Sequence, residues 1–104
     1  MSDDLRQMAD VDRLIHEPAR LLIVTLLYPV EKVDFLYLLH ETQLTKGNLS
    51  AHLSKLEDAG YLGIEKTYRG KIRQTLIRLS PAGRKAFEDY REKLERIVNR
   101  ISQE

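Results

Sequence analysis

Residues 34–62 read DFLYLLHETQLTKGNLSAHLSKLEDAGYL, and this stretch decides the fold. Asp34 is suited to cap the N-terminus of a short apolar helix, and Thr45 is suited to cap a second helix further along. Both side chains carry an oxygen that can accept a hydrogen bond from an unpaired backbone N–H in the first helical turn. The residues between the two helices include a polar link at Thr42 and Gln43. The stretch therefore predicts two helices separated by a short turn.

The second of these helices has an apolar stripe and a clear end. Leu49, Leu53 and Leu56 recur at intervals of four and three residues, which places them on one face. Gly60 stands where a left-handed residue commonly ends a helix. Two helices joined by a turn of about three or four residues form the helix-turn-helix pattern, whose second helix can enter the DNA major groove. We therefore predict a recognition helix over residues 45–59.

The length and composition of the chain limit what it can be. Its 104 residues, 42% of them hydrophobic, suit a single domain over residues 1–104 with one modest core. The first ten residues are acidic and amphipathic, unlike a secretory signal, and the apolar run at residues 21–27 is too short to cross a membrane. We expect a soluble, cytoplasmic protein without a membrane partner.

Side chains with catalytic or metal-binding chemistry are scarce. The chain has no cysteine, which rules out disulfides, thiolate metal sites and a cysteine nucleophile. Its three histidines, His16, His40 and His52, are far apart in sequence, and no glycine-rich phosphate loop is present. We therefore expect no enzymatic activity, no cofactor and no metal site.

Charge is distributed unevenly along the chain, although the formal net charge is only +1. Residues 1–42 contain eight acidic and four basic side chains, a balance of −4. Residues 43–78 contain seven basic and three acidic side chains, a balance of +4. A basic surface confined to one region is typical of proteins that contact phosphates. The segregation supports a nucleic-acid partner for the region that holds the helix-turn-helix.

Two helices are expected before the helix-turn-helix. Ser2 can cap a first helix. The apolar face of that helix comprises Leu5, Met8, Val11 and Ile15. Pro18 disfavours the helical conformation at the residue before it and is itself suited to the first turn of a new helix. The segment from 18 to 28 is apolar almost all round, so we predict the central buried helix there.

Beyond Gly60 the apolar residues alternate with a period of two. Leu62 and Ile64 share one face of a first strand, and residues 75, 77 and 79 share one face of a second. Residues 69–71 form the turn between the strands, and basic side chains surround it. A hairpin that directly follows a recognition helix is a wing, which lies against the minor groove or the DNA backbone. We predict that residues 68–73 make this contact.

Ser80 and Pro81 open a final helix over residues 81–102. Its apolar residues are spaced alternately three and four apart and form a narrow seam, namely Phe87, Tyr90, Leu94, Ile97 and Ile101. Such a seam suits a partner helix, so we predict a homodimer in which this helix packs against its symmetry mate. Packing of the seam within one chain is the alternative. The predicted dimer interface consists of Leu5, Met8, Tyr90, Leu94, Ile97 and Ile101.

Four phrases of the sequence resemble those of winged-helix transcription regulators of bacteria and archaea. They are DRLIHEPARLLIVTLL at 12–27, LTKGNLSAHLSKLEDAGYL at 44–62, YRGKIRQTLIRLS at 68–80 and LSPAGRKAFEDY at 79–90. The chain looks like the compact MarR-like group, with the ArsR-like group as a relative. The expected fold is mainly α-helical with a small β-hairpin (α+β), with a winged-helix core at 18–80 and a dimerisation helix at 81–102. The resemblance also implies a dimer that binds operator DNA and regulates transcription.

Helical geometry indicates which residues of the recognition helix face DNA. With about 100° between successive residues, the side opposite the leucine stripe is small and polar. The predicted contacts of this helix are Lys46, Gly47, Asn48, Ser50, Ala51, Ser54 and Lys55, and those of the wing are Arg69, Lys71 and Arg73. Asn48 and Ser54 can read base edges, whereas the lysines can hold phosphates. Lys66 and Arg78 rank below the three wing residues, and His52 is expected to pack against the core or bond the backbone.

The expected function is that of a dimeric, sequence-specific regulator that binds double-stranded operator DNA. Repression by operator occlusion is expected, because the sequence holds no second domain that would recruit polymerase. A winged-helix module that binds another protein without binding DNA is the alternative. No effector can be named, because Tyr28, Phe35, Tyr37 and Phe87 either line a ligand cleft or form an ordinary aromatic core.

Overall fold

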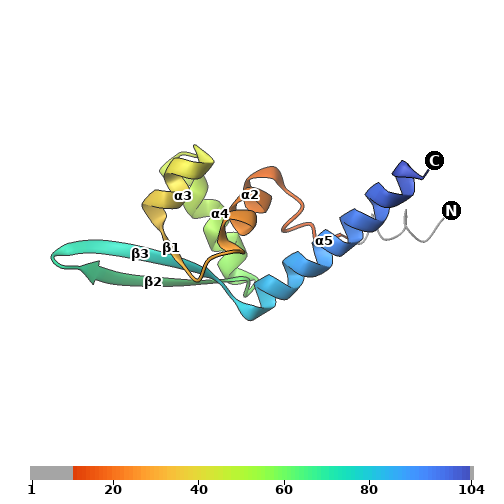
Figure 1. Ribbon diagram of the computed structural model, residues 1–104. Coiled ribbons are helices and arrows are strands. Elements are labelled where there is room, and N and C mark those ends of the chain that lie inside the picture. The colour runs from red at the N-terminus through yellow and green to blue at the C-terminus, as the bar shows by residue number, and fades with distance from the viewer. Residues whose placement is uncertain (1–10, 104) are drawn as a thin grey trace.

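The computed structural model describes residues 11–103. In chain order these residues form helix α2 (Pro18–Leu27), strand β1 (Val33–Asp34), helices α3 (Phe35–Thr42) and α4 (Lys46–Asp58), strands β2 (Leu62–Arg69) and β3 (Ile72–Leu79), and helix α5 (Pro81–Ser102). Helices α2, α3 and α4 gather over one side of the sheet, while the hairpin and α5 extend to opposite ends of the molecule (Figure 1). The predicted fold class, mainly helical with a small hairpin, is confirmed.

The helices begin at the predicted capping residues. The Asp34 carboxylate accepts the backbone N–H of Tyr37 at 2.8 Å, and the Thr45 hydroxyl accepts that of Asn48 at 3.1 Å. Between α3 and α4, Gln43 adopts a left-handed conformation with φ of 60°, which reverses the chain. These local features produce the predicted helix-turn-helix.

Helix α4 ends at Asp58, and Gly60 follows it as the predicted left-handed residue. This residue has φ of +81°, a conformation that glycine adopts without a steric penalty. The N–H of Gly60 donates to the carbonyl of Glu57 at 2.8 Å, and the N–H of Tyr61 donates to that of Leu56 at 2.9 Å. This pair of hydrogen bonds is a Schellman motif. It turns the chain directly from α4 into the wing.

The core lies between α2, the inner face of α4 and the base of the sheet. Fully buried side chains come from each of these elements and include Ile23, Val24 and Leu27 of α2, Leu49 and Leu56 of α4, and Ile77 of β3. The leucine stripe of α4 is therefore scaffold, as predicted. Burial of such stripes provides most of the stability of amphipathic helices.

The hairpin is antiparallel and is extended by a third short strand. The strand order is β1-β3-β2, with Val33 opposite Ile77 and Leu62 opposite Leu79. The turn is shorter than the predicted one, because Arg69 still pairs with Ile72. Only Gly70 and Lys71 remain in it, and Gly70 has the positive φ (65°) that two-residue hairpin turns require.

The prediction of a first helix that continues through Ile15 is wrong for its described part. Residues 11–17 form turns and bends. The Asp12 carboxylate accepts the backbone N–H groups of Leu14 at 2.9 Å and Ile15 at 3.2 Å, and such a turn competes with helix formation. Ile15 is nevertheless fully buried, as its apolar character suggests. Ser2, Leu5 and Met8 lie outside the described residues.

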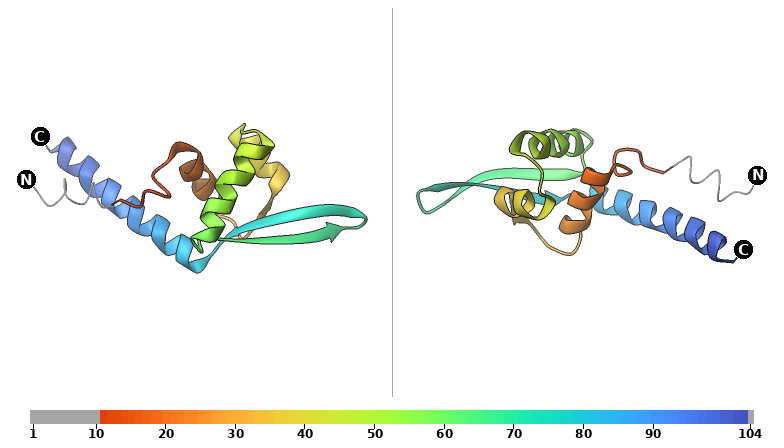
Figure 2. Two further views of the ribbon diagram at one scale, coloured as in Figure 1. Left: turned by 180° about the vertical axis from the view of Figure 1, so that it is seen from behind. Right: turned by 90° about the horizontal axis from the view of Figure 1, so that it is seen from above.

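Helix α5 spans residues 81–102 as predicted and gives the molecule its length. Ser80 caps it by accepting the N–H of Gly83 at 3.0 Å. Figure 2 shows α5 leaving the base of the hairpin and extending away from the other helices. The principal extents are 58 × 25 × 21 Å. The fold thus presents α4 and the wing in one region and the distal end of α5 in another.

Candidate nucleic-acid interface

The face of α4 opposite its leucine stripe is exposed along its whole length. All seven residues predicted to contact DNA from this helix are exposed, namely Lys46, Gly47, Asn48, Ser50, Ala51, Ser54 and Lys55. Small and polar side chains allow a helix to approach the floor of the major groove closely. The N-terminus of α4 also carries the positive end of the helix dipole, which favours a nearby phosphate.

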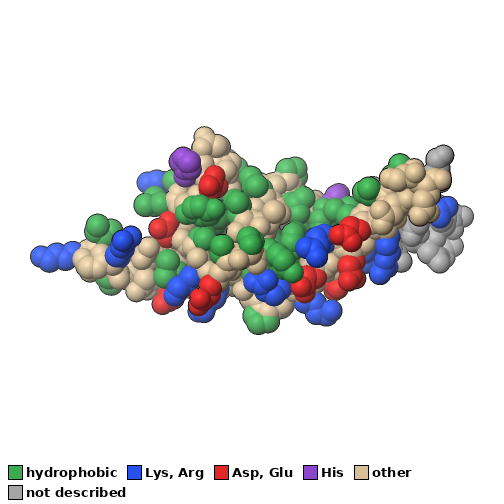
Figure 3. Space-filling view, viewed as in Figure 1, with side chains coloured by type: hydrophobic (Ala, Val, Ile, Leu, Met, Phe, Trp, Pro, Cys, Tyr) green, Lys and Arg blue, Asp and Glu red, His purple; other side chains and the backbone are tan. Residues whose placement is uncertain are grey.

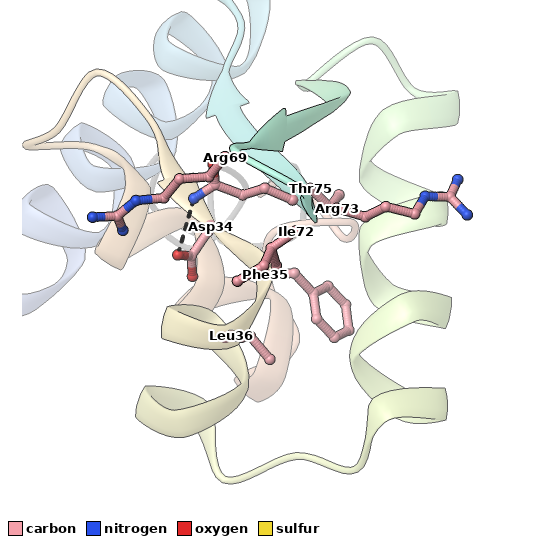
Figure 4. Close-up of a pocket in the computed structure, with 8 residues that line it drawn as sticks. Asp34, Phe35, Leu36, Arg69, Ile72, Arg73 and Thr75 are labelled. Carbon is pink, nitrogen blue, oxygen red and sulfur yellow. Dashed lines mark hydrogen bonds between the residues drawn. The ribbon is translucent and has the colours of Figure 1, made fainter.

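The wing carries its predicted basic residues on two different faces. Arg69, Lys71 and Arg73 are all exposed. Arg73 lies opposite Tyr68 on the neighbouring strand. It is two residues from Thr75, so both side chains lie on the face of the hairpin that is directed toward α4. Arg69 pairs with Ile72 on the reverse face. Figure 4 shows the Arg73 side chain extending toward α4 and the Arg69 side chain extending the opposite way.

A groove separates α4 from the wing. Its volume is about 530 Å³. Its polar lining consists of Ser50, Ser54 and Glu57 from α4, and Lys66 and Thr75 from the strands. Hydroxyl and ammonium groups arranged in this way can bind the phosphates of a DNA strand that passes between the helix and the hairpin.

The groove is also lined by two residues outside the predicted DNA contacts, Lys66 and Thr75. Lys66 was ranked below the wing arginines, and Thr75 was treated only as a strand residue. The period-two pattern could have identified both, because residues on alternate positions share a face with the Tyr68 and Arg73 pair. Arg78, by contrast, pairs with Gly63 on the face directed away from α4.

The basic side chains of this region have no acidic partners among residues 11–103. No salt bridge in that range involves the lysines or arginines of α4, β2, β3 or their turn. On α5, Lys85 pairs with Asp89 at 3.6 Å and Arg91 pairs with Glu95 at 3.8 Å. Figure 3 shows the same contrast, with basic side chains at the end of the hairpin and mixed charges over α5. Cations without protein partners are available to phosphates.

His52 lies on the core side of α4, as predicted, but its partner is a side chain. Its Nδ1 atom is 3.2 Å from Nη1 of Arg20 and 3.8 Å from a carboxylate oxygen of Glu17. Burial would raise the pKa of Glu17, but the backbone N–H groups of Arg20 and Ala19, together with the charge of Arg20, lower it below its usual value. Glu17 is therefore a stable carboxylate cap at the start of α2.

The predicted dimer residues of α5 differ in their solvent exposure within a single chain. Tyr90 and Ile97 are buried at 3% and 7% exposure, Leu94 is partly buried, and Ile101 is 67% exposed. Leu5 and Met8 lie outside the described residues. The exposed apolar side chains near the end of this helix are therefore Ile101 and Val98, which is 57% exposed.

The aromatic residues considered for an effector cleft have separate environments. Tyr28 and Phe87 pack against each other with ring centroids 5.1 Å apart, and Phe87 is buried. The Arg84 guanidinium covers the Tyr28 ring at 4.7 Å. Phe35 lines the groove between α4 and the wing, whereas Tyr37 is 42% exposed. Tyr28 and Phe87 thus form an ordinary aromatic core.

Residues 11–103 contain no group of three or more His, Asp or Glu side chains placed to hold a metal ion. None of the helices in this range is long and apolar enough to cross a membrane.

A helix-turn-helix followed by an antiparallel hairpin, with exposed unpaired cations on both, defines a winged-helix protein of the DNA-binding class. The winged helix DNA-binding domain family matches residues 19–98, and the chain belongs to this family. The family description is that of a DNA-binding domain and not of an enzyme.

Individual proteins similar to this chain include one from an archaeon and two of known structure. An uncharacterised protein of Methanocaldococcus jannaschii is 37% identical over 79 residues, which cover 75% of this chain and 85% of that protein. The structure of a transcriptional regulator homologue from Pyrococcus horikoshii superposes with a TM-score of 0.87 at 22% identity, covering 96% of this chain and 98% of the other. NadR in complex with 4-hydroxyphenylacetate gives a TM-score of 0.69 at 20% identity, covering 94% and 72% of the two chains. At these identities the solved structures establish the fold.

Proposed function

We propose that this protein is a homodimeric, sequence-specific transcriptional regulator of the MarR-like type, which represses by occluding operator DNA. The recognition helix α4 enters the major groove, and the wing lies against the adjacent minor groove and backbone. Its resemblance to regulators of bacteria and archaea, together with a chromosomal DNA partner, supports a location in the cytoplasm of a prokaryotic cell. Neither a cofactor nor a metal takes part in this function.

The observation that carries the proposal is the coincidence of two features on α4 and the wing. The reading face of α4 is small, polar and exposed, and the cations around it have no acidic partner within residues 11–103. A merely solvated surface would not require an exposed face with Gly47 and Ala51 at its centre. A helix that approaches base edges does require small side chains there.

Salt dependence of binding tests the DNA contact. Binding to fragments selected from random DNA should weaken as salt rises, with log K falling against log salt by about 0.9 per phosphate neutralised. A flat response, or no retention of any fragment at low salt, would show that the protein does not bind DNA through this surface. The selected sites should be palindromic with half-sites about one helical turn apart if a dimer binds.

Sequence preference tests the roles assigned to individual residues. Asn48→Ala should change the preference among base pairs by about 1–3 kcal/mol at one position, because an amide side chain can pair bidentately with adenine. Lys55→Ala should weaken all fragments about equally, because a phosphate contact carries no sequence information. Equal losses for both variants across all sequences would contradict base reading by Asn48.

One observation favours the alternative function of a protein-binding module. Leu36 and Ile72 are 67% and 72% exposed, and they line one pocket of about 340 Å³ beside the start of α3 (Figure 4). Exposed apolar side chains grouped in this way can mark a protein contact. Leu36→Ser should leave DNA binding unchanged if the protein is a DNA-binding regulator. The alternative would be supported if the wild-type protein binds no DNA and the Leu36→Ser variant loses binding to a protein partner.

A further inference from the structure

Arg20 connects helix α2 to the recognition helix. Its side chain is only 12% exposed. The Nε–H group donates to the carbonyl of Leu14 at 2.6 Å, and Nη1 is 3.2 Å from Nδ1 of His52 on α4. A guanidinium group can only donate, so Nδ1 of His52 accepts this hydrogen bond. Glu17 completes the cluster, with a carboxylate oxygen 3.8 Å from both partners.

This contact supplies a restraint that the leucine stripe of α4 lacks. Hydrophobic burial of Leu49, Leu53 and Leu56 is strong but non-directional, so it tolerates small rotations of the helix about its axis. A rotation of about 20° would move a side chain on a helix of about 5 Å radius by about 2 Å, which is enough to break a hydrogen bond to a base edge. His52 lies midway along α4, where a directional hydrogen bond limits this rotation.

The segment before Arg20 is itself fixed to α5 and to the base of the wing. Nδ1 of His16 is 2.7 Å from the Tyr90 hydroxyl on α5. The Tyr61 hydroxyl, directly after the end of α4, donates to the Asp12 carboxylate. The turn between them is closed by a hydrogen bond from the His16 N–H to the Asp12 carbonyl at 2.7 Å. Residues 12–20 therefore join α5 to α4 through consecutive hydrogen bonds.

We propose that Arg20 is a positioning residue for DNA recognition, which fixes the rotation of α4 through His52 and transmits the position of α5 through residues 12–20. The inference rests on the proposed function, because the orientation of α4 matters only if α4 reads DNA. It also assigns a role to the turn at residues 12–17. None of these residues lines the groove between α4 and the wing. A movement of the middle of α5 on dimer formation would reach the reading face through this segment.

Four single variants of the protein, and the double variant of Arg20→Met with His52→Leu, test the proposal. Arg20→Met keeps the apolar stem and removes the donors, and His52→Leu removes the acceptor. His52→Asn keeps an acceptor at a similar place. Arg84→Met is the matched control, because Arg84 donates to the Tyr28 carbonyl at 3.0 Å and packs on the Tyr28 ring, and neither contact involves a residue of α4. Each variant is measured for thermal unfolding, for affinity to a selected DNA site and to unrelated DNA, and for amide hydrogen exchange in α4.

Arg20→Met and His52→Leu should each weaken binding to the selected site by about tenfold, and the double variant should lose no more than either alone, because both remove one contact. Binding to unrelated DNA should change by about twofold or less, and His52→Asn should restore most of the specific affinity. Three results would each overturn the proposal. The losses of affinity could multiply in the double variant, or Arg84→Met could lose as much affinity as Arg20→Met. The third is that His52→Asn binds the selected site as weakly as His52→Leu.

The same experiment separates this proposal from the proposed function. A wild-type protein that binds no DNA would contradict the function, whatever the variants do. Amide exchange in α4 of the free protein then still tests the restraint, because Arg20→Met and His52→Leu should accelerate it and Arg84→Met should not. Unchanged exchange in both would overturn the positioning role. If Arg20→Met does not fold, the two His52 variants, made on the more exposed partner, provide the same comparison.

Discussion

At the scale of single residues, Gly83 shows how closely α5 approaches the base of the wing. A Cβ atom at this position would lie 2.2 Å from the carbonyl oxygen of Tyr61 and 2.9 Å from a methyl group of Leu79. The same carbonyl accepts the N–H of Ser80 at 2.9 Å, so the backbone cannot move away without losing that bond. Gly83→Ala should therefore lower the free energy of unfolding by about 2–3 kcal/mol, measured by urea denaturation.

Gly47 is the matched control for this substitution. A Cβ atom there would meet nothing within 4 Å, and the residue lies inside α4. Gly47→Ala should raise the free energy of unfolding by about 0.5–1 kcal/mol, because alanine loses less backbone entropy in a helix. Similar effects at both glycines would mean that the tight contact at Gly83 relaxes at little cost.

Tyr61 should make stability depend on pH in the alkaline range. Burial, with the hydrogen bond to Asp12 and its negative charge, raises the pKa of Tyr61 to about 12. Because the folded state favours the protonated phenol, Tyr61 stabilises the fold fully below its unfolded pKa of about 10. This stabilisation is lost as pH rises toward 12. Tyr61→Phe should be less stable than wild type by about 1 kcal/mol at neutral pH, and this difference should shrink as pH rises from about 10 toward 12.

Urea denaturation at a series of pH values measures this difference between the two proteins. Burial also raises the pKa of Tyr90, but Tyr90 is present in both, so its effect cancels. A difference between wild type and Tyr61→Phe that stays constant from pH 8 to 12 would contradict the role of the Asp12 contact.

The residues that could be predicted from sequence are those whose role depends on near neighbours. Asp34, Thr45 and Ser80 each cap a helix by accepting an N–H three residues ahead, and this chemistry is local. Contacts such as Arg20 with His52 join residues 32 positions apart, and no local pattern encodes them. The exposed face of α4 was predictable because helical geometry alone determines which residues lie opposite a buried stripe.

At the scale of elements, the groove between α4 and the wing contains one side chain that opposes phosphate binding. Glu57 of α4 lines this groove together with Ser54 and Lys66. Glu57→Gln should strengthen binding to all DNA sequences by about two- to fivefold, because it removes one like charge beside the phosphates. Affinities measured at two salt concentrations test this, and the gain should be smaller at high salt.

Glu65 provides the control for this charge. It is exposed on β2 next to Lys66, but it pairs with Leu76 on the face of the hairpin directed away from α4. Glu65→Gln removes the same charge from the chain and should change DNA affinity less than Glu57→Gln does. Equal gains in both variants would indicate a general effect of net charge and not a DNA strand seated in the groove.

The sequence predicted an element correctly where hydrophobic periodicity alone determined it. The prediction was less accurate where side-chain hydrogen bonds to the backbone competed with that periodicity. The hairpin faces follow from strict alternation, and Leu62 and Ile64 do pair with Leu79 and Ile77. Residues 11–15 carry a helical apolar spacing, yet the Asp12 side chain bonds the backbone two and three residues ahead and forms a turn. β1 contains only two residues, too few for any periodicity to reveal.

At the scale of the whole molecule, the shape supports a second copy along α5. The radius of gyration is 15.8 Å, compared with about 13 Å for a compact domain of similar length. The excess comes from the hairpin at one end and α5 at the other (Figure 1). DNA would cover the hairpin in the proposed function, which leaves the apolar end of α5 to a partner helix.

The exposed residues of α5 allow a test of this dimer that spares the fold of the single chain. Ile97 is buried in one chain, so an aspartate there would destabilise the protomer itself, whereas Val98 and Ile101 are exposed. Val98→Asp with Ile101→Asp should therefore leave the melting temperature of the protomer within a few degrees and give a monomer in sedimentation velocity. Because a dimer binds two half-sites at once, its loss should weaken operator binding by about a hundredfold or more. Leu36→Asp, which alters a residue with the same 67% exposure on α3, should leave the dimer intact. A double variant that remains dimeric would place the interface elsewhere on the molecule.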